Sequence, residues 1–332
     1  MRAAGPHFLD KSRRSWQTAA QVVFTLIVLG YLFYKIDRIA FVKLALSCKS
    51  EWIVAAFAAY GVTTALSIWR WHILLRACDE EIRFWRTAQL TMIGLFANAF
   101  MLGSMGGDVL KAYYTARELP HQKARAIVSI VMERLLGFLA MFLLSTILIL
   151  TRYRLLTSEP ITRWAVYLYF ATMIFVVSLI LLGSMRLFHR WIPARLEKNE
   201  ALRKTAQAYH FLLRHTRAFW GGLTISIGAH VALLFTFYFV AMGVGMEIDF
   251  FDLSSILPLV GLVTLLPVTV SGMGLREFSF IHFLSICNVG REAAVALSLG
   301  GFFVLLGWNL LGGLVYLYYR LPHHDEAQPF TK

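Results

Sequence analysis

LGSMGGDVLK, residues 102–111, and LPVTVSGMGLRE, residues 266–277, break two long apolar segments with glycine and place charged side chains directly after the breaks. In a lipid bilayer, a backbone group without a hydrogen-bond partner costs several kcal/mol. A charged side chain at the bilayer centre costs roughly 2.5–3.5 kcal/mol on insertion scales. Two broken and charged segments therefore predict a polar cavity inside the membrane that handles a substrate.

The whole chain has the composition of a polytopic membrane protein. Of its 332 residues, 58% are hydrophobic and 15% are charged, whereas soluble domains carry about 25% charged residues. The net charge of +13 lies mainly in loops, as the positive-inside rule predicts, so it does not indicate a nucleic-acid partner. The three cysteines are widely spaced and the ten histidines form no cluster, so we expect no metal, cofactor or disulfide framework.

Hydropathy predicts an all-α transmembrane bundle in one integral-membrane domain. Its parts are a basic N-terminus (1–16), a first half (17–184), a basic loop (185–218), a second half (219–320) and a polar tail (321–332). Two apolar segments, about 88–105 and 254–288, adjoin the glycine breaks and are predicted to be re-entrant hairpins, with full spans as the alternative. Six full spans are expected, at about 17–35, 52–75, 126–150, 164–184, 219–243 and 292–319.

Loop charges predict the orientation. The segment 186–217 carries eight basic and two acidic residues and is expected to be cytoplasmic, whereas 244–252 carries only acidic charge and suits the outer side. Both termini are then cytoplasmic. The hairpin 88–105 opens inward, with 107–125 in a cytoplasmic segment, and 254–288 opens outward. The two halves are similar in order and opposite in orientation, an inverted repeat of the kind that transporters use.

Glu133-Arg134 is the most informative charged pair, because it lies about two turns inside an expected span. Small residues at spacings of three or four accompany Glu133, so this carboxylate is expected to face protein, either in a structural ion pair or in a lined cavity. The stripe comprises Ala126, Ser129, Gly137 and Ala140, and a second stripe comprises Ala296, Gly300, Val304 and Gly307.

The remaining candidates flank the glycine breaks. Asp108 and Lys111 share one face of a helix start, as an interfacial cap or as a headgroup site. Backbone N–H groups at Gly272–Gly274 could hold an anion beside Arg276. Arg70 is explained by snorkelling to the interface. A lone His230 is expected either to relay protons or, as is more common, to form a hydrogen bond to a neighbour. The full set of candidate binding residues is Asn98, Asp108, Lys111, Glu133, Arg134, Arg276, Glu277 and Asn309, and the candidate flexible backbone is Gly103, Gly106, Gly107, Pro267, Gly272 and Gly274.

These motifs resemble the flippase-like membrane family related to the transmembrane part of lysylphosphatidylglycerol synthase, over about residues 15 to 320. The matching residues are Arg70-Trp71 with Leu74-Leu75, Asn98 to Lys111, Glu133-Arg134, and Pro267 to Glu277. Lys111 stands where the family usually has arginine, and Glu133 where it usually has aspartate. The resemblance implies a bacterial or archaeal plasma-membrane protein that moves a lipid between leaflets.

We therefore expect a translocase for an anionic or phosphate-bearing lipid, with the acyl chains staying in the bilayer. The synthase branch of the family carries a soluble domain after the membrane part, whereas this sequence ends in a short polar tail, and no P-loop, HExxH or GxSxG motif occurs, so we expect no enzyme. The alternatives are a membrane-embedded transferase or accessory subunit in lipid or lipid-linked glycan synthesis, or a scaffold that binds lipid-biosynthesis enzymes.

Overall fold

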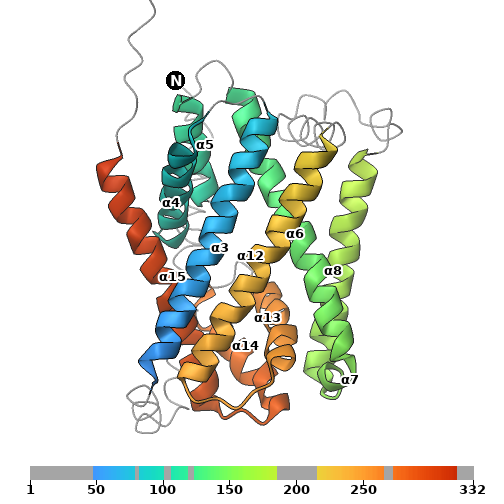
Figure 1. The fold of residues 1–332 in the computed structure, drawn as a ribbon. Coiled ribbons are helices and arrows are strands. Elements are labelled where there is room, and N and C mark those ends of the chain that lie inside the picture. Colours follow the sequence, from blue (N-terminus) through green and yellow to red (C-terminus); the bar gives the residue numbers. More distant parts are fainter. Residues whose placement is uncertain are drawn as a thin grey trace, which may run out of the picture.

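The computed structural model describes residues 48–78, 82–100, 106–118, 123–184, 215–264 and 272–319. They form a helical membrane bundle, and no strand occurs within these ranges (Figure 1). Five of the described helices are long and apolar enough to cross a membrane, which confirms five of the six expected spans. The sixth, at 17–35, lies outside the described residues. The five are α3 (Ser50–Ala77), α6 (Lys123–Thr151), α8 (Pro160–Ser184), α12 (Thr216–Gly243) and α15 (Arg291–Tyr318).

The antiparallel pair α3 and α12 forms the centre of the bundle (Figure 1). The start of α3 is tied to the end of α12, because the Lys49 N–H donates to the Gly243 carbonyl at 3.0 Å. Lipid supplies no strong hydrophobic driving force between helices, so their association depends on close packing. Glycines allow the helix backbones to approach closely. A Cβ at Gly222 of α12 would overlap the side chain of Leu136 on α6, so this glycine admits a third helix to the centre.

Two helical hairpins enter the bundle without crossing it. The first consists of α4 (Phe84–Phe100) and α5 (Gly106–Glu118), and the second of α13 (Phe250–Thr264) and α14 (Leu275–Leu284). The longest of these helices, α4, has 17 residues, which is about 25 Å at 1.5 Å per residue and too short for a hydrocarbon core of about 30 Å. Figure 1 shows the two hairpins in opposite halves of the bundle, so both are re-entrant as predicted.

The returning limb of the first hairpin corrects one expectation. Residues 107–125 are predicted as a cytoplasmic segment, yet Gly106–Glu118 is helix α5 and packs against α4 and α6. Polarity is a poor guide here because the polar side chains face the bundle interior. Lys111 is only 5% exposed and Thr115 is fully buried. The first hairpin therefore extends from Phe84 to Glu118, whereas the second agrees well with the expected 254–288.

The helix contacts repeat in the two halves with opposite direction. Helices α3, α4, α5 and α6 correspond in order to α12, α13, α14 and α15. The hairpin helix α4 packs against α15 of the other half, as α13 packs against α6, and α5 packs on α6 as α14 packs on α15. Along the chain, the short helix α7 (Tyr153–Leu156) and α8 separate the two sets. A 3-10 turn (Ser285–Cys287) follows α14.

Polar contacts join the two halves at both ends of the bundle. At one end, the Arg152 guanidinium lies 2.6 Å from Asp249 and 2.7 Å from Asp252, which links the end of α6 to the start of α13. The hydrogen bond that Arg152 donates lowers the pKa of the Asp249 carboxyl. At the opposite end, the Tyr319 hydroxyl donates to Glu118 at 2.5 Å, which links the end of α15 to the end of α5. Each half thus contributes a spanning helix whose end is bonded to the hairpin of the other half.

The small-residue stripe of α15 packs as its sequence predicts. Ala296 and Val304 are buried, a Cβ at Gly300 would overlap Val240 of α12, and Gly307 lies against the Phe57 ring of α3. Further along the same helix, Gly312 lies against the backbone of Met92 on α4. Glycine is therefore needed where α15 meets the first hairpin.

Substituting Gly312 with alanine is expected to lower the free energy of unfolding by about 1–3 kcal/mol, because the new Cβ would overlap the Met92 carbonyl oxygen. Gly221→Ala on α12 is the matched control, since no atom lies within 4 Å of a Cβ there, and alanine favours a helix over glycine by up to about 1 kcal/mol. Thermal unfolding in detergent compares them. Equal melting temperatures would contradict the close contact of α4 and α15.

Candidate functional site

A polar cavity of about 360 Å³ lies within the bundle between α3, α4, α5, α6 and α12. Its volume is in the range of ligand sites, which is about 300–1,000 Å³. Five of the eight predicted binding residues line it, and they come from three different helices: Asn98, Asp108, Lys111, Glu133 and Arg134. The structure thus brings together residues up to 36 positions apart in the sequence, from the first glycine break to the span that follows it.

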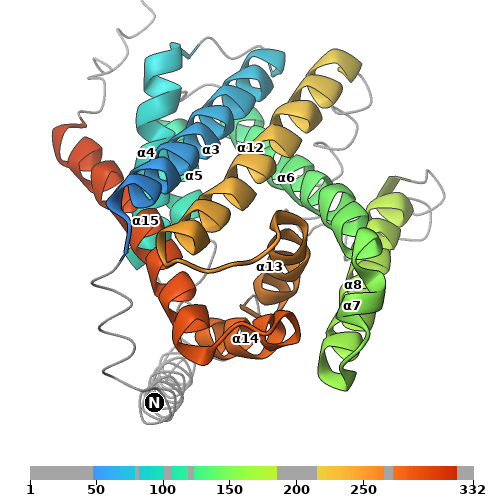
Figure 2. The same ribbon diagram turned by 60° about the horizontal axis from the view of Figure 1, so that its bottom comes forward.

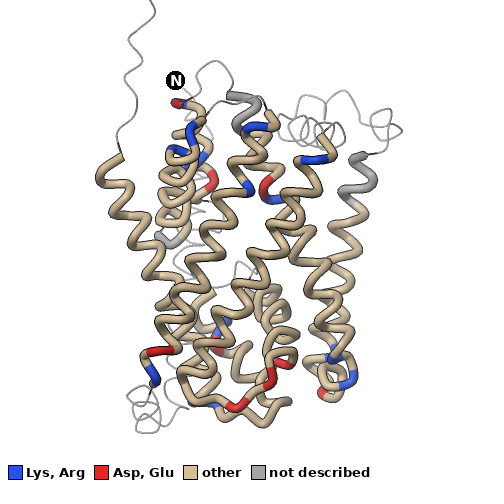
Figure 3. The backbone as a smooth tube through the Cα atoms, viewed as in Figure 1, with Lys and Arg blue, Asp and Glu red and all other residues tan. Residues whose placement is uncertain are grey.

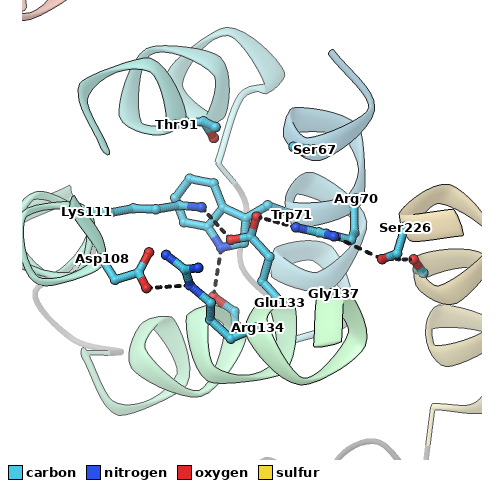
Figure 4. Close-up of polar contacts among 12 residues, drawn as sticks. Ser67, Arg70, Trp71, Thr91, Asp108, Lys111, Glu133, Arg134, Gly137 and Ser226 are labelled. Carbon is cyan, nitrogen blue, oxygen red and sulfur yellow. Dashed lines mark hydrogen bonds and ion pairs between the residues drawn. The ribbon is translucent and has the colours of Figure 1, made fainter. Parts of the chain in front are cut away.

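Glu133 is at the centre of the charged network (Figure 4). Its carboxylate accepts a hydrogen bond from Lys111 Nζ at 2.5 Å on one oxygen and from Arg70 Nη2 at 3.0 Å on the other. The side chains are 12%, 6% and 11% exposed, respectively. A carboxylate buried this deeply would be strongly destabilising alone, so the two cations are required to keep it charged. As predicted, Glu133 faces protein.

Lys111 contacts the aromatic ring of Trp71 in addition to its ion pair with Glu133. Its ammonium lies 3.6 Å from the centroid of the Trp71 ring, within the range of a cation–π contact. Trp71 is fully buried, and its indole N–H donates to Ser129 at 3.2 Å. Ser129 belongs to the same small-residue stripe as Glu133, so α6 positions both the counter-ion of Lys111 and the support for the ring beneath it.

The first glycine break places Lys111 at the cavity. A Cβ at Gly107 would overlap the Gly94 carbonyl oxygen, so only glycine allows α5 to lie this close to α4. The Gly107 N–H donates to Asn98 Oδ1 at 2.8 Å, which satisfies a free group at the start of α5. Gly106 is the first residue of this helix. Gly103 lies outside the described residues.

Arg70 corrects a second expectation, because it does not snorkel to the interface. Besides Glu133, it donates from Nη1 to Ser226 on α12 at 3.0 Å. Its position near the end of α3 looks like that of a snorkelling residue, and local spacing gives no sign of partners on α6 and α12. Gly137 lies one turn after Glu133 on the same face of α6, and a Cβ there would be in ordinary contact with Arg70 Nη1 at 3.5 Å, so this glycine gives no specific signal of the pair.

Arg134 and Asp108 form a second and more accessible pair at the cavity. Arg134 Nε donates to Asp108 Oδ2 at 2.5 Å, and the two side chains are 45% and 24% exposed. Solvent-exposed ion pairs contribute only about 0–1 kcal/mol, whereas breaking a buried pair from one side costs about 3–5 kcal/mol. A competing anion would therefore displace Asp108 from Arg134 far more easily than Glu133 from Lys111.

The cavity walls carry more positive than negative charge. Among the residues that the structure describes, Arg70, Lys111 and Arg134 line the cavity with two carboxylates, Asp108 and Glu133, which leaves one positive charge in excess. His230 also lines the cavity, where its Nε2 lies 3.0 Å from the Gly137 carbonyl oxygen, in agreement with the expected bond to a neighbour. The arrangement favours an anion with several acceptor oxygens, such as a phosphate.

The residues of the second glycine break form a separate cluster on α14. Arg276 donates to Glu277 at 2.8 Å and to Ser298 of α15 at 3.0 Å. The Gly274 N–H donates to Glu277 Oε2 at 2.6 Å, so the chain's own carboxylate occupies the position predicted for a bound anion. Gly272 and Gly274 have positive φ, as a sharp turn requires. Pro267 lies beyond the described residues.

Asn309, the last predicted residue, is half-buried on α15 and belongs neither to the polar cavity nor to the cluster on α14. The predicted set thus divides into five residues at one cavity, two on α14 and one elsewhere. Whether these residues bind a substrate stays a prediction.

Comparison with known proteins agrees with this architecture. The family model described as "Lysylphosphatidylglycerol synthase TM region" matches residues 18–313, which confirms the resemblance drawn from the motifs. A UPF0104 membrane protein from Methanocaldococcus jannaschii is 25% identical over 129 residues, which are 39% of this chain and 37% of the relative. The match thus spans little more than a third of that relative's length.

A double-mutant cycle on Lys111→Met and Glu133→Gln tests the buried pair. Glu133→Gln is expected to destabilise the protein by about 3–5 kcal/mol, because it leaves the buried Lys111 and Arg70 without their counter-ion. Lys111→Met should cost less, because Glu133 keeps Arg70 as a partner, and the double variant should cost clearly less than the sum. The exposed pair Arg152→Gln and Asp249→Asn is the control and should show weaker coupling. Unfolding in detergent measures both cycles; additive effects at Lys111 and Glu133 would contradict the network.

Proposed function

Since this chain belongs to the family of the lysylphosphatidylglycerol synthase TM region, we propose that it moves an anionic, phosphate-bearing lipid between the leaflets of the plasma membrane. The observation that carries the proposal is the excess of one cation among the charged walls of a cavity inside a membrane bundle. A lipid phosphate would supply the missing negative charge and the acceptor oxygens. Intramembrane charges of this kind generally mark a substrate path.

In this proposal, Arg134 is the cation that exchanges partners. It gives up Asp108 and binds the phosphate, while Glu133 keeps Lys111 and Arg70 in place. The order follows from burial, because the Arg134–Asp108 pair is the more exposed and therefore the weaker one. Asp108 stays near the start of α5, where the helix dipole favours its negative charge.

The inverted hairpins supply a route for alternating access. In transporters with inverted repeats, substrate binds near the bilayer midplane at discontinuous helices, and one repeat moves against the other. Here α5 and α14 both begin at glycines, and each carries charged side chains in its first turns. We infer that Arg276 and Glu277 hold the place in the second half that Lys111 and Asp108 hold in the first, just after a glycine break, while their partners differ.

Charge at the ends of the bundle supports a cytoplasmic position for both termini. The end at which α3 finishes and α12 begins carries a group of arginines (Figure 3): Arg76, Arg83, Arg86, Arg117 and Arg217. At the opposite end lie the acidic residues Glu247, Asp249 and Asp252 together with the basic residues Arg152, Arg154 and Arg291, so acidic and basic charges are mixed there. Basic loops face the cytoplasm. The first hairpin, with the polar cavity, would then open inward and the second outward.

We expect transport rather than a chemical reaction, because the cavity residues form an anion-binding arrangement and no nucleophile with an adjacent base can be named among them. A membrane-embedded transferase or accessory subunit in lipid synthesis is the alternative. It would require product formation by the purified protein from a lipid and a donor.

Reconstitution in liposomes tests the proposal. With headgroup-labelled phosphatidylglycerol and a quencher added outside, the wild type should exchange lipid between leaflets. Arg134→Gln should slow exchange about tenfold or more, since a charge-assisted hydrogen bond contributes roughly 1.5–3 kcal/mol. Arg154→Gln, an exposed arginine on α7, is the matched control and should exchange lipid at the wild-type rate.

Exchange that is equally fast in the Arg134→Gln variant would contradict the assigned site. Folded wild-type protein that exchanges none of a panel of anionic lipids would contradict the translocase itself and favour the transferase or accessory subunit.

A further inference from the structure

A second cavity of about 580 Å³ adjoins the polar one, and its walls are almost entirely apolar. It lies between α6, α8, α12, α13 and α14; Figure 2 shows α13 between α12 and the peripheral helix α8. Its wall includes Phe142, Tyr169, Val176, Phe237 and Leu257, and Arg276 of α14 also lines it. The proposed headgroup site does not account for a space of this size and character.

The two cavities are adjacent. Phe138, Met141, His230 and Leu233 line both of them, so the polar cavity lies beside the apolar one along α6 and α12. A charged cavity beside an apolar one, with wall residues in common, matches a ligand with a charged head and a hydrocarbon tail. Neither a free phosphate nor a soluble sugar phosphate would need the second cavity.

We propose that the apolar cavity binds a hydrocarbon tail of the same lipid whose phosphate lies beside Arg134; this rests on the proposed function. It replaces the expectation that the acyl chains stay in the bilayer. One tail leaves the bilayer and lies between α6, α8, α12 and α13, with its headgroup end near His230.

The physical chemistry of apolar cavities supports this occupant. An engineered cavity of about 150 Å³ lined by Leu, Ile and Phe stays dry and takes up apolar guests such as benzene. The present cavity is several times larger and lies in a membrane, where hydrocarbon is the surrounding solvent. Moving a tail from lipid into the protein gains little hydrophobic energy, since lipid is as apolar as Leu. The site would therefore orient the lipid and select tail shape more than it would raise affinity.

Gly261 offers a way to fill the cavity without disturbing its walls. It lies on α13 in the cavity wall, and a Cβ there would meet no atom within 4 Å. Gly261→Trp should therefore place its ring in the space assigned to the tail. Gly221→Trp on α12 is the matched control, because Gly221 is equally open and lines neither cavity.

The probe is phosphatidylglycerol with a photoreactive diazirine near the end of one acyl chain, in nanodiscs with the full chain. After illumination, mass spectrometry maps the labelled residues. Label is expected at cavity residues such as Phe142, Val176 and Leu257, and Gly261→Trp should reduce it about tenfold, since overlap of tail and ring costs about as much as an overpacked core. Gly221→Trp should leave it unchanged. If Gly261→Trp melts below its control, Gly261→Leu takes its place.

The outcomes separate this inference from the proposed function. Label confined to lipid-facing residues such as Ile174 and Phe175, or cavity label that the Gly261 variants do not reduce, would overturn the tail site even if the wild type exchanges lipid between leaflets. Cavity label that the Gly261 variants reduce would support the tail site even in a wild type that exchanges no lipid, and the absence of exchange would then overturn only the translocase.

Discussion

The buried carboxylate of Glu133 is the constraint on which the rest of the structure depends. A carboxylate inside the membrane must be paired, and here it takes one cation from the hairpin helix α5 and one from the span α3. Because these cations come from separate elements, satisfying one charge also fixes how α3, α5 and α6 pack. The glycine contact between α4 and α5 and the small residues of α6 then make the approach of Lys111 and Arg70 sterically feasible.

The two inverted halves use their charges differently. In the first half, the carboxylate lies on the span and is shared between helices, and Arg134 extends the network toward solvent. In the second half, Glu277 turns back onto the Gly274 N–H and its neighbour Arg276, and α15 contributes Ser298, a neutral residue. The second cluster is therefore balanced within itself, whereas the first has a cation in excess. This difference is why the first half is the better candidate for initial capture of an anion.

Much of this architecture can be predicted from the sequence, and the failures have physical causes. Apolar length predicts the spans, glycine breaks predict the hairpins, and the small-residue stripe predicts that Glu133 faces protein. A helix start at Asp108 is expected, but the return of α5 into the bundle is missed because buried polar groups give the same composition as a cytoplasmic segment. The role of Arg70 is missed because its partner Glu133 is 63 residues away, and no local spacing encodes that contact. The apolar cavity beside α8 depends on the packing of five helices, which no single segment specifies.

Cryo-electron microscopy of the protein in nanodiscs of phosphatidylglycerol would show whether the cavity around Glu133 receives a lipid phosphate. We expect phosphate density in contact with Arg134, with Asp108 released and the Lys111–Glu133–Arg70 network intact. An unchanged Arg134–Asp108 pair, with lipid phosphates only on the outer surface of the bundle, would contradict this expectation.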